Sequence, residues 1–175
     1  YAVVPQLVEG AYGLKRNVAL PDSPELRAAR ARYVGFPAAQ KPASVMLGDT
    51  ISGETFWVGA LMNKWAERWV SYWTDGQGTM ATTAEEDIAF CQALALQGKA
   101  GRVDPKRALI LMRASNYDMP PNGESAEELL AAEAHEQGFS GFIPAVNAAY
   151  TVGSVGVRNI ATNWDRYDKK IPVEQ

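Results

Sequence analysis

Residues 45–57 read VMLGDTISGETFW, and this pattern predicts a short strand, a tight turn and the start of a helix. The apolar run at residues 45–47 has the composition of a buried strand, and the two glycines give the backbone freedom that the turn needs. In an α/β fold such a turn lies at the carboxyl edge of the sheet, where polar groups meet ligands. The alternative is that Asp49 and Ser52 only cap the turn and that Trp57 packs in the core.

A second segment repeats this arrangement further along the chain. Residues 108–112, ALILM, form a continuous apolar run, as expected for a strand that is covered on both faces. Polar residues follow directly at 113–118. Because ligands bind beyond the carboxyl ends of the strands in open sheets, we expect the polar groups after both strands to lie at one edge. The sequence therefore predicts an α/β fold with a ligand site at that edge.

The other elements are predicted from periodicity and capping signals. The tryptophans at 65, 69 and 73 recur at every fourth position of a predicted helix, and rings at this spacing usually pack in a core. We therefore expect Trp65, Trp69 and Trp73 to be buried, and Trp57, at the mouth of the turn, to be partly exposed. The patterns predict helices over residues 1–20, 25–33 (with Ser23 as N-cap), 55–73, 88–96, 125–135 and 142–164, and a strand over 79–83.

Composition excludes several classes of function. The chain has 175 residues and a formal net charge of -3, so it is one domain, or a piece of one, without the basic stripe that a nucleic-acid polymer requires. No apolar run approaches the ~20 residues that span a bilayer. The first residue is Tyr1, which suggests processing of the amino terminus or a missing upstream portion.

Familiar catalytic and metal-binding patterns are also absent from the sequence. One cysteine and one histidine cannot make a zinc site of the usual type, and neither common glycine-rich phosphate loop is present. The histidine, His135, lies among glutamates, so we expect it at the surface rather than in a catalytic triad. We expect no metal and no cofactor.

Five motifs, collinear over nearly the whole chain, resemble the purine nucleoside permease family: GDTxSGxTxW at 48–57, WTDG at 73–76, TTAxED at 82–87, GRVD at 101–104 and RASNxD at 113–118. The resemblance implies a nucleoside-phosphorylase-like, three-layer α/β fold with a central mixed sheet flanked by helices. It also implies that residues 1–175 are the carboxyl-terminal portion of a single such domain, with the amino-terminal half absent. A periplasmic or secreted location is favoured by the same resemblance.

The resemblance assigns roles to individual residues. Glu86 stands where related phosphorylases have a Met-Glu pair whose carboxylate holds the ribose hydroxyls, and Glu85 stands at the Met position. Asn116 resembles the Asp or Asn that contacts purine N7 and stabilises the leaving base. These two, Glu86 and Asn116, are the candidate catalytic residues. The candidate substrate-binding residues are Asp49, Thr50, Phe56, Trp57, Thr83, Glu85, Asp87, Ser115 and Asp118.

The function implied by the resemblance is purine nucleoside binding with cleavage of the N-glycosidic bond. Phosphate is a possible cosubstrate, and its ligands would belong to the amino-terminal half. A nucleoside-binding or uptake protein without turnover is the alternative, and a structural or lectin-like interaction protein is a third. We expect Glu86 and Asn116 to share one pocket. A fragment with so few strands would leave part of its apolar surface exposed to water. We therefore also expect the chain to pack against the amino-terminal half of its precursor or against another copy of itself.

Overall fold

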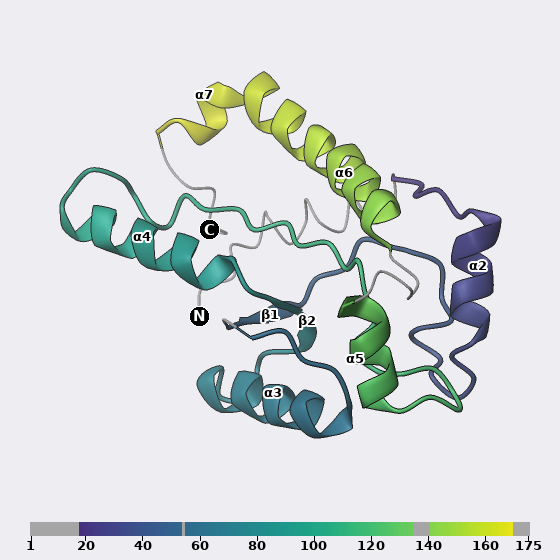
Figure 1. The fold of residues 1–175 in the computed structure, drawn as a ribbon. Helices are drawn as coiled ribbons and strands as arrows, with labels where there is room; N and C mark the ends of the chain where they lie inside the picture. Colours follow the sequence, from purple (N-terminus) through teal and green to yellow (C-terminus); the bar gives the residue numbers. More distant parts are fainter. Residues whose placement is uncertain (1–17, 54, 135–140, 170–175) are drawn as a thin grey trace.

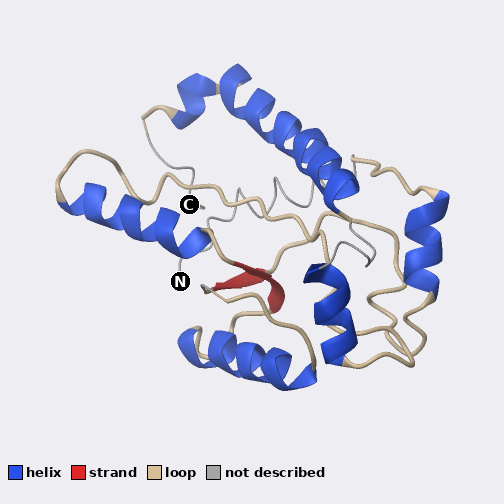
Figure 2. Ribbon diagram, viewed as in Figure 1, coloured by secondary structure: helices blue, strands red, loops and turns tan. Residues whose placement is uncertain are grey.

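The structure is a computed structural model that describes residues 18–53, 55–134 and 141–169 (Figure 1). These residues form a mixed α/β fold, as predicted, in which helices surround one small sheet (Figure 2). The elements are α2 (Pro24–Ala31), β1 (Asp49–Ser52), α3 (Ala60–Trp73), β2 (Met80–Ala84), α4 (Asp87–Lys99), α5 (Ala126–Ala134), α6 (Phe142–Thr162) and α7 (Trp164–Tyr167).

The sheet is a parallel pair of strands. In its register Thr50 lies opposite Thr82, and the two hydroxyl oxygens are 2.8 Å apart. The ladder is extended at both ends, where the Asp49 N–H donates to the Thr79 carbonyl at 2.8 Å and the Gly53 N–H donates to the Ala84 carbonyl at 3.0 Å. Parallel strands need a long crossover connection, and α3 supplies it here.

Helix α3 packs against both strands of this sheet. Its buried residues are Ala66 and Val70, which are four positions apart and therefore lie on one face of the helix. Ala66 is completely buried, and its small side chain lets the helix lie close to the sheet. Helix α6 lies at the opposite end of the molecule in the view of Figure 1, and a Cβ added at its Gly153 would lie 3.5 Å from Leu111 Cδ2.

Of the three predicted strands, the one at 79–83 is confirmed by β2 to within one residue, and the other two are wrong. The strand expected at 45–47 lies instead at β1, because the hydrogen-bonded register with β2 includes the β-branched Thr50 and Ile51 rather than the apolar run before them. The segment 108–112 forms no strand. No described strand runs beside it, so its backbone has no ladder to join, and Leu109 is 56% exposed. Accordingly, the described residues show a two-stranded sheet and not the mixed central sheet of a three-layer fold.

The tryptophan helix is shorter and more exposed than its sequence predicts. It begins at Ala60 rather than at residue 55, because Gly59 has a φ of 98°, which is incompatible with a helix. The predicted burial of its rings is wrong: Trp65 is 42%, Trp69 39% and Trp73 70% exposed. Successive rings contact one another along the helix, with Trp69 stacked on Trp73 at 5.8 Å. Among the described elements, the ones that pack mainly on α3 are β1 and β2, and they do not cover these rings.

Other helices agree with the sequence. Ser23 caps α2 by accepting a hydrogen bond from the Leu26 N–H at 3.3 Å, with Pro24 at the first helical position. Helix α4 begins at Asp87 in the predicted acidic stretch, and α5 and α6 occupy the predicted ranges to within a few residues. Most of the helix predicted over 1–20, together with His135, lies outside the described residues.

We expect the substitution Gly48→Ala to destabilise the sheet. A Cβ at this position would lie 2.3 Å from the Ala81 Cβ, so the two strands would have to separate. Overpacking of this kind costs about 1–3 kcal/mol in the free energy of unfolding. Thermal and urea unfolding of the intact protein measure the loss, and the added substitution Ala81→Gly should restore part of it.

Gly53→Ala is the matched control for this prediction. It lies at the other end of β1, where an added Cβ meets nothing within 4 Å, so its unfolding free energy should change by less than about 0.5 kcal/mol. Equal melting temperatures for Gly48→Ala and Gly53→Ala would show that the close approach of the strands at Gly48 does not contribute to stability.

Candidate functional site

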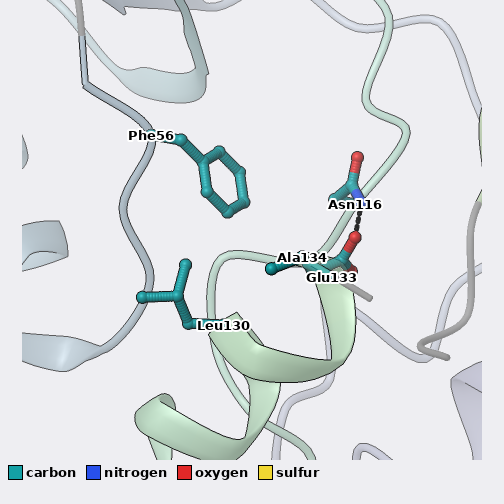
Figure 3. Close-up of a pocket in the computed structure, with 5 residues that line it drawn as sticks. All are labelled: Phe56, Asn116, Leu130, Glu133 and Ala134. Atoms are coloured by element: carbon teal, nitrogen blue, oxygen red, sulfur yellow. Dashed lines mark hydrogen bonds between the residues drawn. The ribbon is translucent and has the colours of Figure 1, made fainter. Parts of the chain in front are cut away.

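Five residues line an open hollow of about 290 Å³: Phe56, Asn116, Leu130, Glu133 and Ala134 (Figure 3). Phe56 comes from the loop before α3 and Asn116 from the segment that follows residues 108–112. The other three lie on α5 at a spacing of three and four positions, which places them on one face of the helix. This volume is just below the range of roughly 300–1,000 Å³ that is typical of small-molecule sites.

A chain of side-chain hydrogen bonds orients the polar groups of the hollow. Ser115 Oγ donates to Asn116 Oδ1 at 2.7 Å, and Asn116 Nδ2 donates to Glu133 Oε2. Burial raises the pKa of the Glu133 carboxyl above its usual value, and the hydrogen bond from Asn116 acts in the opposite direction. Apolar walls with a few fixed polar groups are the usual composition of a ligand site.

The two loops that carry Phe56 and Asn116 are joined behind the hollow. The Gly59 N–H donates to the Asp118 carbonyl at 2.6 Å. Asn63, in the first turn of α3, accepts a hydrogen bond from Trp57 Nε1 at 3.4 Å and bonds through its side chain to the Asp118 carboxyl. Burial raises the pKa of this carboxyl, and the bond from Asn63 lowers it. In this geometry Asp118 and Trp57 hold the loops together, and neither lines the hollow.

Tyr117 anchors the Asn116 segment to the region around α2. Its ring lies against the ring of Tyr33 with a centroid distance of 4.0 Å, and its hydroxyl donates to the Ala39 carbonyl at 3.2 Å. Burial raises the pKa of Tyr33 to about 12, so this phenol is uncharged at neutral pH. The Asn116 side chain is thus held by Ser115 and Glu133, and the next residue, Tyr117, fixes the segment against Tyr33 and the Ala39 carbonyl.

The remaining candidate residues lie at the sheet rather than at the hollow. The Asp49 carboxylate accepts a hydrogen bond from the Thr79 N–H at 2.7 Å, and Thr50 pairs with Thr82 across the strands. Thr83 is half-buried in β2 opposite Ile51. The structure therefore gives Asp49 and Thr50 structural contacts in the sheet, which is the capping alternative that the sequence left open for Asp49.

The acidic stretch lies just past β2, at the start of α4. Glu85 and Glu86 are exposed, and Glu86 occupies the N-cap position without a side-chain capping bond. Asp87 Oδ2 is buried and accepts no hydrogen bond from the described part of the chain. Nearby, Ser52 Oγ at the end of β1 accepts a hydrogen bond from the Ile88 N–H at 3.1 Å. This group occupies the carboxyl edge of the parallel pair, the place where open sheets bind ligands.

The candidate residues are thus divided among the hollow, the junction of the two loops and the sheet. Phe56 and Asn116 line the hollow, whereas Glu86 is not among its lining residues, so a pocket shared by Glu86 and Asn116 stays a prediction. The sequence did not single out Leu130, Glu133 and Ala134, because an amphipathic helix gives no sign of what its face meets. Partial exposure of Trp57 is confirmed.

We expect Asn63→Ala to lower the unfolding free energy by about 1–2 kcal/mol at pH 7, since it removes a hydrogen bond to the half-buried carboxyl of Asp118. The folded-state pKa of Asp118 is already raised, so its charged form costs stability as pH rises through that pKa, and the substitution enlarges this cost. The loss should shrink below about pH 3.9, where Asp118 is protonated even in the unfolded chain. Urea unfolding of the intact protein at both pH values measures the loss.

Asn147→Ala is the control, because Asn147 is an exposed asparagine of α6. Its effect should be small and the same at both pH values. A loss in Asn63→Ala that does not depend on pH would contradict the assigned contact with Asp118.

Comparisons with known proteins cover nearly the whole chain. Residues 1–172 match the model of the purine nucleoside permease family. A purine nucleoside permease of Candida albicans is 25% identical over 169 residues, which are 97% of this chain and 41% of that protein. A probable purine nucleoside permease of Schizosaccharomyces pombe is 25% identical over 159 residues, which are 90% of this chain and 44% of the relative. The chain thus spans about two fifths of the length of these relatives. No solved structure matches it.

Two further findings concern the described residues alone. None of their helices is long and apolar enough to cross a membrane. They contain no group of three or more His, Cys, Asp or Glu residues that could hold a metal ion. The match over residues 1–172, together with the motifs of the sequence, shows that the chain belongs to the purine nucleoside permease family.

Proposed function

We propose that this chain contributes a purine-nucleoside-binding site to a protein of nucleoside uptake, and that the hollow between Phe56 and α5 receives the base. The observation that carries this proposal is the oriented amide of Asn116, which faces an aromatic ring across an apolar hollow (Figure 3). The relatives are named purine nucleoside permeases, which favours binding and uptake over bond cleavage.

The chemistry of the hollow suits a purine. Phe56 is 44% exposed, so its ring has a free face on which a base can stack. The Asn116 amide has two N–H groups, and one of them remains for a ligand after the bond to Glu133. Directed at purine N7, this N–H would hold the base in one orientation. Glu86 and Asp87 at the sheet edge are proposed to hold the ribose, since carboxylates accept strong hydrogen bonds from hydroxyls.

Cleavage of the N-glycosidic bond is the second candidate function. The same Asn116 N–H would stabilise negative charge on a departing base, although an amide supplies no proton. Incubation of the intact protein with inosine or adenosine, with and without phosphate, distinguishes the two functions. We expect saturable binding without release of free base. Release that depends on phosphate would establish phosphorolysis, and release without phosphate would establish hydrolysis.

We expect Phe56→Ala to weaken nucleoside binding while leaving stability nearly unchanged. Loss of a stacking ring typically costs about 1–3 kcal/mol per base, so Kd should rise roughly 5- to 100-fold. Isothermal calorimetry with adenosine measures the change. The control is Phe90→Ala on α4, whose ring has a similar exposure of 54% and does not line the hollow. Equal affinities for the two variants would place the nucleoside elsewhere.

A second proposal concerns the aromatic face of α3, formed by Trp65, Trp69, Tyr72 and Trp73. We propose that further polypeptide of the same protein, the amino-terminal half implied by the family resemblance, packs on this face and completes the three-layer sheet. Two observations support it: the rings are exposed and contiguous, and the chain spans about two fifths of its relatives. A parallel pair with so little cover is otherwise unusual, because parallel sheets are normally buried on both faces.

Sedimentation of the isolated 175-residue chain tests this proposal. We expect the chain alone to aggregate or to melt without cooperativity, and to become a well-defined particle when the further polypeptide is supplied. The substitution Trp73→Glu should weaken that association, because it places a charge on the proposed interface. A cooperatively folded monomer would contradict the proposal, and a stable dimer of this chain would assign the face to a second copy.

A further inference from the structure

Glu133 was not predicted as a site residue, yet its carboxylate occupies a distinctive place in the hollow. One oxygen, Oε2, accepts the hydrogen bond from Asn116 Nδ2. The other, Oε1, accepts no hydrogen bond from the described residues. The hollow around it is otherwise lined by the apolar side chains of Phe56, Leu130 and Ala134 (Figure 3). An acceptor in such a setting has most to gain from a ligand that brings an N–H group.

The orientation of Asn116 decides which part of a base this acceptor meets. Ser115 donates to Asn116 Oδ1, so the amide nitrogen is the atom directed toward Glu133. Its second N–H and the Glu133 carboxylate are therefore neighbours in the hollow, one a donor and the other an acceptor. A base that bonds to this pair must present an acceptor beside a donor.

Purines differ in this respect at the edge that includes N7. Adenine presents the N7 acceptor beside the N6 amino donor, whereas guanine presents two acceptors, N7 and O6. Hypoxanthine carries the same two acceptors as guanine. With Asn116 at N7, the neighbouring carboxylate meets the substituent on C6. An ionised carboxylate only accepts hydrogen bonds, so it binds an amino group and repels a carbonyl oxygen.

We infer that Glu133 is a specificity-determining residue, which makes the hollow select 6-aminopurine nucleosides such as adenosine over 6-oxopurine nucleosides such as inosine. This inference rests on the proposed function, because it takes the hollow to be the base site. Discrimination by a good pair of base contacts corresponds to a preference on the order of 10- to 100-fold. Phe56, which stacks on any base, contributes nothing to this preference.

The test compares dissociation constants of the intact protein for adenosine and inosine, in the wild type and in Glu133→Gln. Glutamine has nearly the same shape, accepts the Asn116 bond through its oxygen and offers an N–H that can donate to O6. We expect the wild type to bind adenosine 10- to 100-fold more tightly and the variant to bind the two nucleosides about equally. The control is Glu127→Gln, an exposed glutamate on the same helix, which should keep the wild-type ratio.

A third nucleoside, 7-deazaadenosine, tests the contact between Asn116 and N7 separately. It keeps the amino group and lacks the N7 acceptor, so the wild type should bind it more weakly than adenosine.

The outcomes separate the inference from the proposed function. Binding of both nucleosides with a ratio that Glu133→Gln leaves unchanged would overturn the inference alone, as would tighter binding of inosine by the wild type. Failure of the wild type to bind either nucleoside would overturn the proposed function and this inference with it. Unchanged melting temperatures of the two glutamine variants establish that any change in ratio comes from the site.

Discussion

The parallel pairing of β1 with β2 is the contact on which the rest of this structure depends. It joins segments that are distant in sequence, since the paired Thr50 and Thr82 are 32 positions apart. Its register places the carboxyl ends of both strands together, where α4 begins. The strands approach this closely because Gly48 has no side chain at the point where it meets Ala81. Helix α3, which connects the strands, can then lay Ala66 and Val70 on the sheet, and this fixes the direction of the helix and of the loop before it.

A second contact converts this scaffold into a site. The loop before α3 and the segment carrying Asn116 are far apart in sequence, and the Gly59–Asp118 hydrogen bond with the Asn63 bridge holds them together. The positive φ of Gly59 both ends the loop and directs its N–H toward Asp118. The backbone geometry at Gly59 therefore helps to place Phe56 opposite Asn116. Both residues lie in loops, and the hydrogen bonds between the loops hold them there.

Local sequence signals predict the helices and caps that depend on neighbouring residues. They do not predict features that depend on contacts with residues far away in the sequence. The Ser23 cap, the strand near 79–83 and the helices rest on spacing and capping, which the sequence contains. The apolar run at 108–112 predicts a strand that does not form, because hydrophobicity alone does not show whether a partner strand exists. Likewise Asn116 was predicted as a site residue from its motif, whereas Glu133 becomes visible only when α5 is placed against it.

The tryptophans of α3 also show that a sequence pattern does not reveal whether a partner surface is present. Their recurrence at every fourth residue predicts burial. The rings do lie on one face of the helix, where they contact one another in sequence order. What the described chain lacks is a surface opposite them, since its sheet has two strands and α3 already covers it with Ala66 and Val70. Contiguous aromatic surface costs free energy in water, whereas hydrophobic side chains exposed singly are ordinary. The spacing of the rings therefore identifies a face suited to packing, but it does not show whether the chain supplies a surface that covers that face.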